Sequence, residues 1–198
     1  MESVPLMGAR CSLRPLQKEN VDSLLASLSD PDINQYLRFK VPEHFGRQRS
    51  IIENSTDNPN RLTLGVYLNS PENVNERGSF IGIAGFANIN HYNRTATGRM
   101  IISEKVMWGQ GYGTEARLLQ LRYGFEHLGL RWIWGSAFAP NIGSIKLLTK
   151  AGYEEIGRRP QSWRIGDTYF HEILFGISAE KWRALETTKT DLLASSPI

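Results

Sequence analysis

The sequence lacks the features that mark secreted and membrane proteins. Only one of its 198 residues is a cysteine, so no disulfide can form within the chain. No window approaches the run of about 18 apolar residues that a membrane-spanning helix needs, and the first residues lack the apolar core of a secretory signal. Cys11 alternates with polar neighbours and is expected to be a buried apolar residue. We therefore expect a cytoplasmic protein without a membrane partner.

Charge and histidine content argue against two further classes. The net charge is +3, and the basic residues are spread along the chain, whereas dedicated nucleic-acid binders gather them on one face. Nucleic acid is therefore not an expected partner. None of the four histidines stands at metal-ligand spacing from another, so we expect no metal. They are His44, His91, His127 and His171.

Hydrophobic periodicity predicts one α/β domain over residues 1–186, followed by a polar, flexible tail over 187–198. The predicted strands cover 10–16, 61–68, 80–89, 95–103, 131–138, 153–159 and 168–177, and the predicted helices cover 19–28, 32–39, 44–54, 114–129 and 141–152. Three consecutive strands with short connections indicate an antiparallel meander. The expected architecture is a mixed, mostly antiparallel central sheet flanked by helices on both faces.

The strongest chemical signal is Trp108-Gly109-Gln110-Gly111-Tyr112-Gly113-Thr114-Glu115-Ala116, where three glycines separate a strand from a helix. Glycines let the backbone turn sharply and bring its N–H groups close to a ligand. The N–H groups of the helix's first turn have no internal partner and lie at its positive end. Together they form a cradle for a phosphate or pyrophosphate. The alternative is a glycine-rich turn that only joins two elements.

A dinucleotide-binding fingerprint also matches this segment, as Gly111-x-Gly113-x-x-Ala116. That fingerprint requires the first βα unit of a parallel sheet and an acidic residue about 20 residues on, at the end of the next strand. Here the preceding strands form a meander, and the next strand ends in 136–139 as Ser-Ala-Phe-Ala, without a carboxylate. A nicotinamide or flavin cofactor is therefore disfavoured.

A second motif, Asn141-x-x-Ser144, opens the following helix, which ends in Lys150-Ala151-Gly152-Tyr153. Taken by itself, this pattern suits an N-capped helix. In this order and at this spacing, the two motifs resemble those of the GNAT superfamily of N-acetyltransferases, most closely its ribosomal-protein-alanine acetyltransferase-like branch. The segment from Glu180 to Trp182 looks like this branch too, and the resemblance covers residues 8–186.

The resemblance implies the GNAT fold, with acetyl-coenzyme A as acyl donor and an amine as acceptor. In that fold, the strand near Ile101 and Ile102 pairs with the pantetheine arm like an added β-strand. The thioester enters a splay between the 95–103 strand and the 131–138 strand. The cofactor-binding residues that the resemblance assigns are Ile101, Ile102, Trp108, Gly109, Gln110, Gly111, Tyr112, Gly113, Thr114, Asn141, Ser144 and Lys150.

Direct transfer in a ternary complex is the mechanism that the resemblance implies. A backbone N–H near Ile102 would stabilise the oxyanion, and Ser144 would protonate the departing thiolate. Related sequences often carry Glu on the strand before the glycine loop, but here residues 97–100 are Thr-Gly-Arg-Met, so the motif supplies no carboxylate base. Trp108 stands where the superfamily often has Gln or Arg, although Trp is usual in this branch. His91, after a strand expected to border the acceptor site, is the candidate base; the alternative is a solvated loop residue.

The acceptor and two rival functions stay open. A protein N-terminal α-amine, a polyamine, an aminoglycoside and an amino acid all fit the sequence. An α-amine is favoured because its pKa of about 7.7–8.0 makes deprotonation cheaper than for lysine, at about 10.4. The rivals are a non-catalytic acyl-CoA-binding or regulatory module and an RNA-associated accessory protein. A homodimer also stays open.

Overall fold

A computed structural model describes residues 6–37, 46, 49, 50, 52, 58–69 and 77–194. Side chains are described within these ranges except at 77 and 187–194. The helix expected over 44–54 and the loop expected after 69 lie largely outside the described residues. None of the described helices is long and apolar enough to span a membrane.

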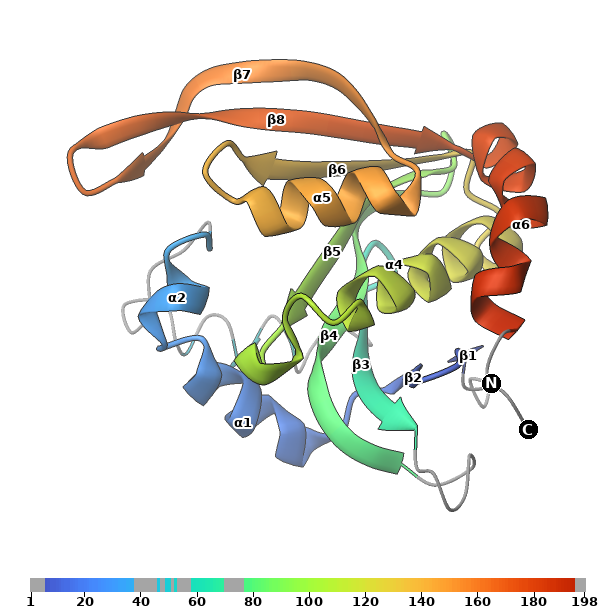
Figure 1. The fold of residues 1–198 in the computed structure, drawn as a ribbon, viewed down its shortest axis with the longest axis horizontal. Helices are drawn as coiled ribbons and strands as arrows, with labels where there is room; N and C mark the ends of the chain where they lie inside the picture. The colour runs from blue at the N-terminus through green and yellow to red at the C-terminus, as the bar shows by residue number, and fades with distance from the viewer. Residues whose placement is uncertain are drawn as a thin grey trace.

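Eight strands form one sheet in the order β1-β2-β3-β4-β5-β6-β8-β7 (Figure 1). Neighbouring strands are antiparallel except for β5 and β6, which are parallel. The predicted mixed, mostly antiparallel sheet is confirmed. The strands are β1 Leu6–Met7, β2 Cys11–Pro15, β3 Leu62–Asn69, β4 Arg77–Asn90, β5 Thr95–Ile102, β6 Trp132–Phe138, β7 Glu154–Ile165 and β8 Thr168–Ser178.

Helices connect and flank these strands. They are α1 Lys18–Ser27, α2 Pro31–Asn34, the 3₁₀ turn η1 Lys105–Met107, α4 Tyr112–Arg122, the π-helical turn η2 Tyr123–His127, α5 Ile142–Ala151 and α6 Ala179–Ala194. The expected single helix over 114–129 is therefore α4 followed by a π turn. The short strand β1 was not predicted from the sequence. Strand β7 was predicted to end at Arg159, but it extends six residues further.

The flexible tail expected over 187–198 stays a prediction, and the chain there is helical over most of its length. Helix α6 continues through this polar stretch as far as Ala194. A helix that has been nucleated gains a hydrogen bond with each added residue at small entropic cost, so polar composition alone does not end it. The expected domain boundary at 186 is not tested by this observation and stays a prediction.

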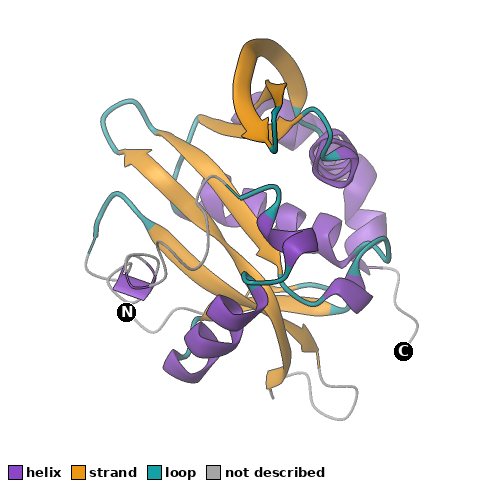
Figure 2. Cartoon of the chain, turned by 90° about the vertical axis from the view of Figure 1, so that its left-hand side faces the viewer, coloured by secondary structure: helices purple, strands orange, loops and turns teal. Residues whose placement is uncertain are grey.

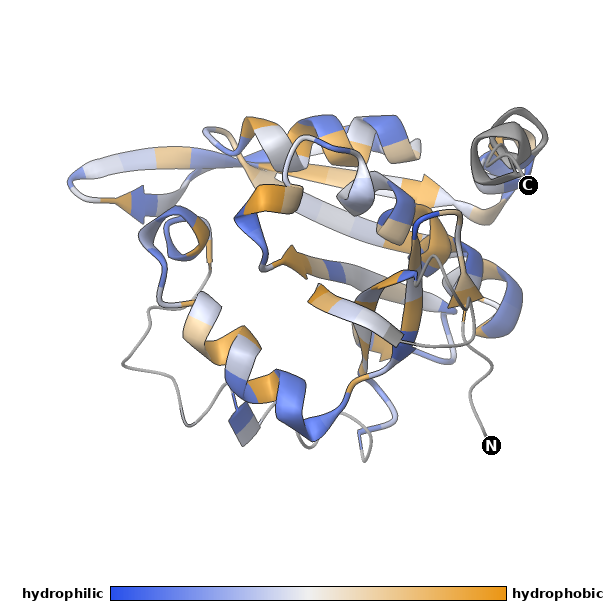
Figure 3. Cartoon of the chain, turned by 60° about the horizontal axis from the view of Figure 1, so that its bottom comes forward, coloured by the Kyte–Doolittle hydropathy of each residue, from blue (hydrophilic) through white to orange (hydrophobic). Residues whose placement is uncertain are grey.

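Helices cover both faces of the sheet (Figure 2). On one face, here called the α4 face, Ala116 and Leu119 of α4 pack with strands β2 to β4, and Leu148 of α5 packs with β6 and β8. On the other, the α1 face, Leu24 of α1 belongs to a cluster that Ile101 of β5 joins. Apolar and polar residues alternate around α1 and α5, as Figure 3 shows, because each helix buries only one side.

Strands β5 and β6 are paired at only one end. Thr95, Ala96 and Thr97 pair with Trp132, Ile133 and Trp134, and the pairing stops there. Strand β6 continues to pair with β8 as far as Phe138, so only its contact with β5 is lost. The expected splay is confirmed. It lies between residues 98–102 of β5 and residues 135–138 of β6.

The first unpaired residue on each strand of the splay is a glycine. A Cβ at Gly98 would lie 2.8 Å from Nη1 of Arg117 and 3.2 Å from the Tyr153 hydroxyl, and a Cβ at Gly135 would lie 3.2 Å from the same tyrosine ring. Tyr153, which follows α5, therefore occupies space under both glycines on the α4 face. Its side chain lies where the two strands begin to separate.

Gly85 of β4 offers a test of this close strand packing. A Cβ there would overlap the carbonyl oxygen of Leu62 on β3, and backbone cannot rotate away as a side chain can. We expect Gly85→Ala to lower the free energy of unfolding by about 1–3 kcal/mol, measured by chemical denaturation. Gly143→Ala is the control, because its Cβ would meet only Asn141 Oδ1 at 3.7 Å within a helix. It should leave stability unchanged or raise it by up to about 1 kcal/mol, and equal losses in both variants would contradict the packing argument.

Candidate active site

Two glycines of the loop between η1 and α4 have backbone angles that other residues rarely adopt. Gly109 has φ +75° and Gly111 has φ +91°, both in the left-handed region. Gly111 is the N-cap of α4, and its carbonyl oxygen accepts from the N–H of Glu115 at 3.0 Å. The sharp turn inferred from the motif is therefore present, and it directs the start of α4 toward the splay.

The third glycine has a different role. A Cβ at Gly113 would lie 2.9 Å from Cδ1 of Leu147 on α5 and 3.6 Å from Cγ1 of Ile102 on β5. Its absence lets the first turn of α4 pack closely against both elements. The start of α4, the middle of α5 and the end of β5 consequently meet at one point.

The first turn of α4 keeps its hydrogen-bond donors available. As the N-cap, Gly111 has no side chain to bond the N–H groups that follow it, and no side chain among the described residues caps this turn. The N–H groups of Tyr112, Gly113 and Thr114 lie at the positive end of the helix dipole. This arrangement fits a phosphate or pyrophosphate, which requires closely spaced donors and a positive potential.

A buried carboxylate fastens this loop to the amino-terminal strands. Glu115 accepts from the backbone N–H of Arg10 at 2.7 Å, the N–H of Cys11 at 3.2 Å and Nε of Arg10 at 3.0 Å. Nη1 of Arg10 in turn donates to the carbonyl of Gln110 at 3.0 Å, and the guanidinium lies 4.6 Å from the Tyr112 ring centroid. Arg10 thus holds the loop and places a positive charge beside it. No motif in the sequence indicated this role for Arg10.

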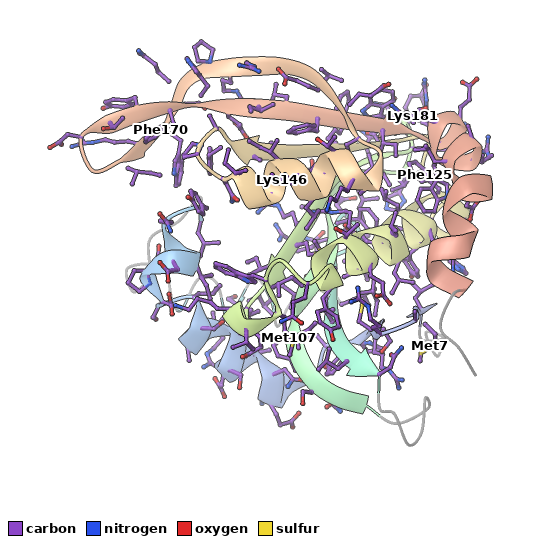
Figure 4. The ribbon with its side chains drawn as sticks, viewed as in Figure 1. Met7, Met107, Phe125, Lys146, Phe170 and Lys181 are labelled. Carbon is purple, nitrogen blue, oxygen red and sulfur yellow. The ribbon has the colours of Figure 1, made fainter. Side chains whose placement is uncertain are left out.

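Trp108 and Gln110 support the loop from within. The indole N–H of Trp108 donates to the carbonyl of Ile102 at 3.0 Å, and the amide of Gln110 donates to the carbonyl of Val106. Met107 lies in the same segment, just before α4 (Figure 4). Two residues expected to bind the cofactor therefore use their side chains to fix the loop.

Cys11 lies under this loop and is buried, as expected. Burial raises the pKa of its thiol above the ordinary value, and the nearby Glu115 carboxylate raises it further. A thiol in this environment stays protonated and is a poor nucleophile. A covalent acyl-cysteine route is therefore disfavoured.

The backbone of β5 presents alternate residues to the splay. The N–H of Ser103 donates to the carbonyl of Ile81, and antiparallel pairs alternate between bonding and non-bonding residues. The backbone groups of Ile101 accordingly face β4, whereas those of Ile102 and Met100 face the splay. Of the two isoleucines expected to pair with the pantetheine arm, only Ile102 is placed to do so, and Met100 is a further position that sequence reasoning missed.

The start of α5 borders the same splay. Asn141 follows β6, its side-chain oxygen accepts from the backbone N–H of Ser144 at 3.0 Å, and it therefore caps the helix. Its amide NH₂ and the Ser144 hydroxyl have no partner among the described residues. Lys150 lies on the exposed surface one turn beyond Leu147, the residue that contacts Gly113. The loop, Asn141 and Ser144 are thus brought together, with Lys150 further along α5.

His91 is not part of this group. It lies in the turn after β4, where its Nε2 is 2.9 Å from the carbonyl oxygen of Pro59. This turn precedes Thr95, so seven residues of β5, or roughly 23 Å at the usual rise per residue, separate it from Ile102. The sequence shows that His91 follows a strand, but it does not show which end of that strand lies at the splay. Among the described residues, no three potential metal ligands lie together either.

The long β7–β8 hairpin forms a wall on the α1 face. The ring of Trp163 on β7 stacks on Phe138 of β6 with centroids 4.3 Å apart. Its indole N–H donates to the carbonyl of Gln35 at 3.4 Å, and the hydroxyl of Tyr36 donates to the carbonyl of Pro140 at 3.3 Å. Figure 4 shows Phe170 in the same hairpin, above α2. Segments near α2, β6 and β7 therefore meet beside the open end of the splay.

Comparison with known proteins identifies the class. A family model described as an acetyltransferase (GNAT) domain matches residues 10–154, well over half of the chain. The chain therefore belongs to the GNAT acetyltransferases and is an acetyl-coenzyme A-dependent acyltransferase.

Individual relatives agree with this assignment. The uncharacterized N-acetyltransferase p20 of Bacillus licheniformis is 29% identical over 77% of this chain and 83% of its own length. The uncharacterized N-acetyltransferase YoaA of Bacillus subtilis is 25% identical over 75% of this chain and 81% of its own. The fold resembles that of spermidine N-acetyltransferase from Vibrio cholerae, solved with CoA and spermine, with TM-score 0.76 and 19% identity over 87% of this chain and 98% of that one.

Substitution at the loop glycines tests the cradle. We expect Gly111→Val to abolish acetyl-CoA binding in isothermal titration while the protein stays folded, because a branched side chain is strained at φ +91° and would obstruct the phosphates. Gly109→Ala is the matched variant: it adds strain at φ +75° but meets nothing within 4 Å. It should weaken binding less than Gly111→Val. Unchanged affinity in a folded Gly111→Val protein would contradict the cradle.

Proposed function

We propose that this protein acetylates a primary amine by direct transfer from acetyl-CoA in a ternary complex. One observation carries the proposal: the open first turn of α4 adjoins the splay, and Asn141 and Ser144 border the same opening. Donor and acceptor held together in this way react as if in one molecule, which supplies much of the rate.

Each element has a proposed role toward the donor. The backbone of the glycine loop holds the pyrophosphate, with the charge of Arg10 beside it. The backbone of Met100 and the N–H of Ile102, whose carbonyl accepts from Trp108, pair with the amide-rich arm, and the free NH₂ of Asn141 donates to the same arm. Lys150 is proposed to interact with the donor's phosphates from α5.

The chemistry follows from groups at the splay. A neutral amine attacks the thioester carbonyl carbon, the C–S bond breaks, and the acetyl group becomes an amide. A splay-facing backbone N–H near Ile102 stabilises the negative charge that develops on the carbonyl oxygen. The Ser144 hydroxyl gives a proton to the departing sulfur, water takes up the proton lost by the amine, and water returns a proton to Ser144.

The acceptor is proposed to be an α-amine, in keeping with the ribosomal-protein-alanine acetyltransferase-like motifs. Strand β5 carries no carboxylate in the splay, where Arg99 stands between Gly98 and Met100. Deprotonating an α-amine at pH 7 costs roughly 1–1.4 kcal/mol, against about 4.6 kcal/mol for lysine, so an α-amine needs less help from a base. A cytoplasmic location and a homodimer stay predictions.

The alternative is an acyl-CoA-binding or regulatory module that does not turn over. Membership of the acetyltransferase family disfavours it, although the splayed part of β5 carries no carboxylate base. Sustained release of CoA in the presence of an amine acceptor distinguishes an enzyme from this module.

Ligand-dependent melting tests donor binding. Because the cradle exists only in the folded state, acetyl-CoA at 100 times its Kd should stabilise the protein by about 2.7 kcal/mol. For a chain of this size, Tm should rise by roughly 5–11 °C. NAD and ATP serve as comparison ligands. A shift with NAD and none with acetyl-CoA would refute the assignment of the cradle.

The role of Ser144 is tested by Ser144→Ala. We expect kcat to fall about 10- to 100-fold with little change in acetyl-CoA affinity, since a general acid acts mainly in the transition state. The Asn141 cap should survive, because it uses the backbone N–H of Ser144. Thr149→Ala, on the exposed side of α5, is the control. Unchanged turnover in Ser144→Ala, with chemistry shown to limit the rate, would rule out the role.

A further inference from the structure

The α1 face of the splay carries an arginine that the transfer chemistry does not use. Ile101 of β5 packs with the α1 cluster, and residues two apart on a strand share a face, so Arg99 and Thr97 lie on the α1 face. Thr97 is the last residue of β5 paired with β6, and Arg99 stands two residues further on, within the splay. Its side chain is partly buried but still reaches solvent.

Arg61 adds a second guanidinium to this region. Partial burial lowers the pKa of Arg99 from its ordinary value, and the positive charge of Arg61 lowers it further. Gly85 of β4 pairs with Arg99 on one side and with Thr63, two residues after Arg61, on the other. Because Gly85 has no side chain, none stands between the two arginines at this position of the sheet. Within the part of the chain that the structure describes, neither guanidinium has an ion pair or hydrogen bond. Glu104, five residues beyond Arg99, lies past the end of β5.

Among the described residues, the carboxylates of β8 and α2 on the α1 face already have cationic partners. Glu172 of β8 pairs across the sheet with Phe138, is 1% exposed, and accepts from Nη1 of Arg159 at 2.6 Å. The two aspartates at the start of α2 both bind Nζ of Lys105 at 2.8 Å. The charges of Arg99 and Arg61 are therefore not balanced by these groups.

We propose that the acceptor amine belongs to a molecule with a carboxylate, which Arg99, assisted by Arg61, binds on the α1 face of the splay. A guanidinium offers two parallel N–H donors to a carboxylate, and a bound anion relieves the repulsion between two neighbouring cations. This proposal rests on the proposed function, because it places the acceptor on the α1 face of the splay, opposite α4 and α5, with its amine directed at the thioester. A polyamine would meet the same positive field and be disfavoured.

Matched acceptors test this assignment. The panel contains glutamate and glutaminamide, in which both carboxylates are replaced by carboxamides, a dipeptide amide with aspartate second and the same dipeptide amide with asparagine second, and spermidine. In the wild type, the acidic member of at least one pair should have a kcat/KM at least about tenfold above its neutral partner, as expected for a hydrogen-bonded charge pair. Which pair discriminates identifies a free amino acid or a peptide as the source, and spermidine should be slower than the favoured acid.

Arg99→Gln should remove this preference. We expect it to lower kcat/KM for the acid about 10- to 100-fold, to change that for the neutral partner less than about twofold, and to leave acetyl-CoA affinity intact. Arg94→Gln makes the same charge change in the turn at the paired end of β5 and should leave both members unchanged. Wild-type rates that are equal for acid and amide, faster turnover of spermidine, or an equal loss for both members in Arg99→Gln would overturn the proposal.

Binding provides a readout that does not depend on turnover. With CoA saturating, N-acetylglutamate or the N-acetylated aspartate-containing dipeptide amide should bind the wild type at least about tenfold more tightly than Arg99→Gln in a titration. If no amine is acetylated although acetyl-CoA binds, the transfer function fails, and this titration still decides the carboxylate site. Equal binding to both proteins, or no detectable binding to either, overturns it.

Discussion

The separation of β5 from β6 is the constraint on which the rest of the site depends. Two strands that pair at Thr97 and Trp134 would continue to pair if nothing lay beneath them. Here the next residue on each strand is a glycine, and the Tyr153 side chain fills the space that two Cβ atoms would take. Once the strands diverge, the backbone groups of β5 that would have bonded β6 are left to face a ligand.

A buried cation lies at the same point on the α4 face. Arg117 is 6% exposed, and its Nη1 donates to the side-chain oxygen of Gln120 at 2.6 Å. Gln120 in turn donates to the carbonyl of Arg99 at 3.0 Å. Burial lowers the pKa of Arg117, but an arginine so far above neutral pH keeps its proton. The splay therefore has a fixed positive charge beneath Gly98, at the end where β5 and β6 begin to separate.

Sequence reasoning succeeded where the information is local. The glycine loop, the Asn141 cap and the Gly152 helix end depend on residues a few positions apart, and the structure places each as expected. Whether the backbone groups of Ile101 and Ile102 face β4 or the splay could not be predicted, because this depends on which residues of β4 they pair with. His91 failed for a similar reason: a strand has two ends, and only the three-residue pairing with β6 shows which end is open.

The contact between Arg10 and Glu115 has a consequence for the order of folding. It joins residues 105 positions apart, and such long-range contacts form late because the entropy of closing the loop must be lost first. The helix start and its glycines are local, so they form early but stay without their support until the amino-terminal strands join the sheet. During refolding, the protein should therefore gain its full affinity for acetyl-CoA only after most of the secondary structure has formed. The amino terminus, synthesised first, completes the cradle last.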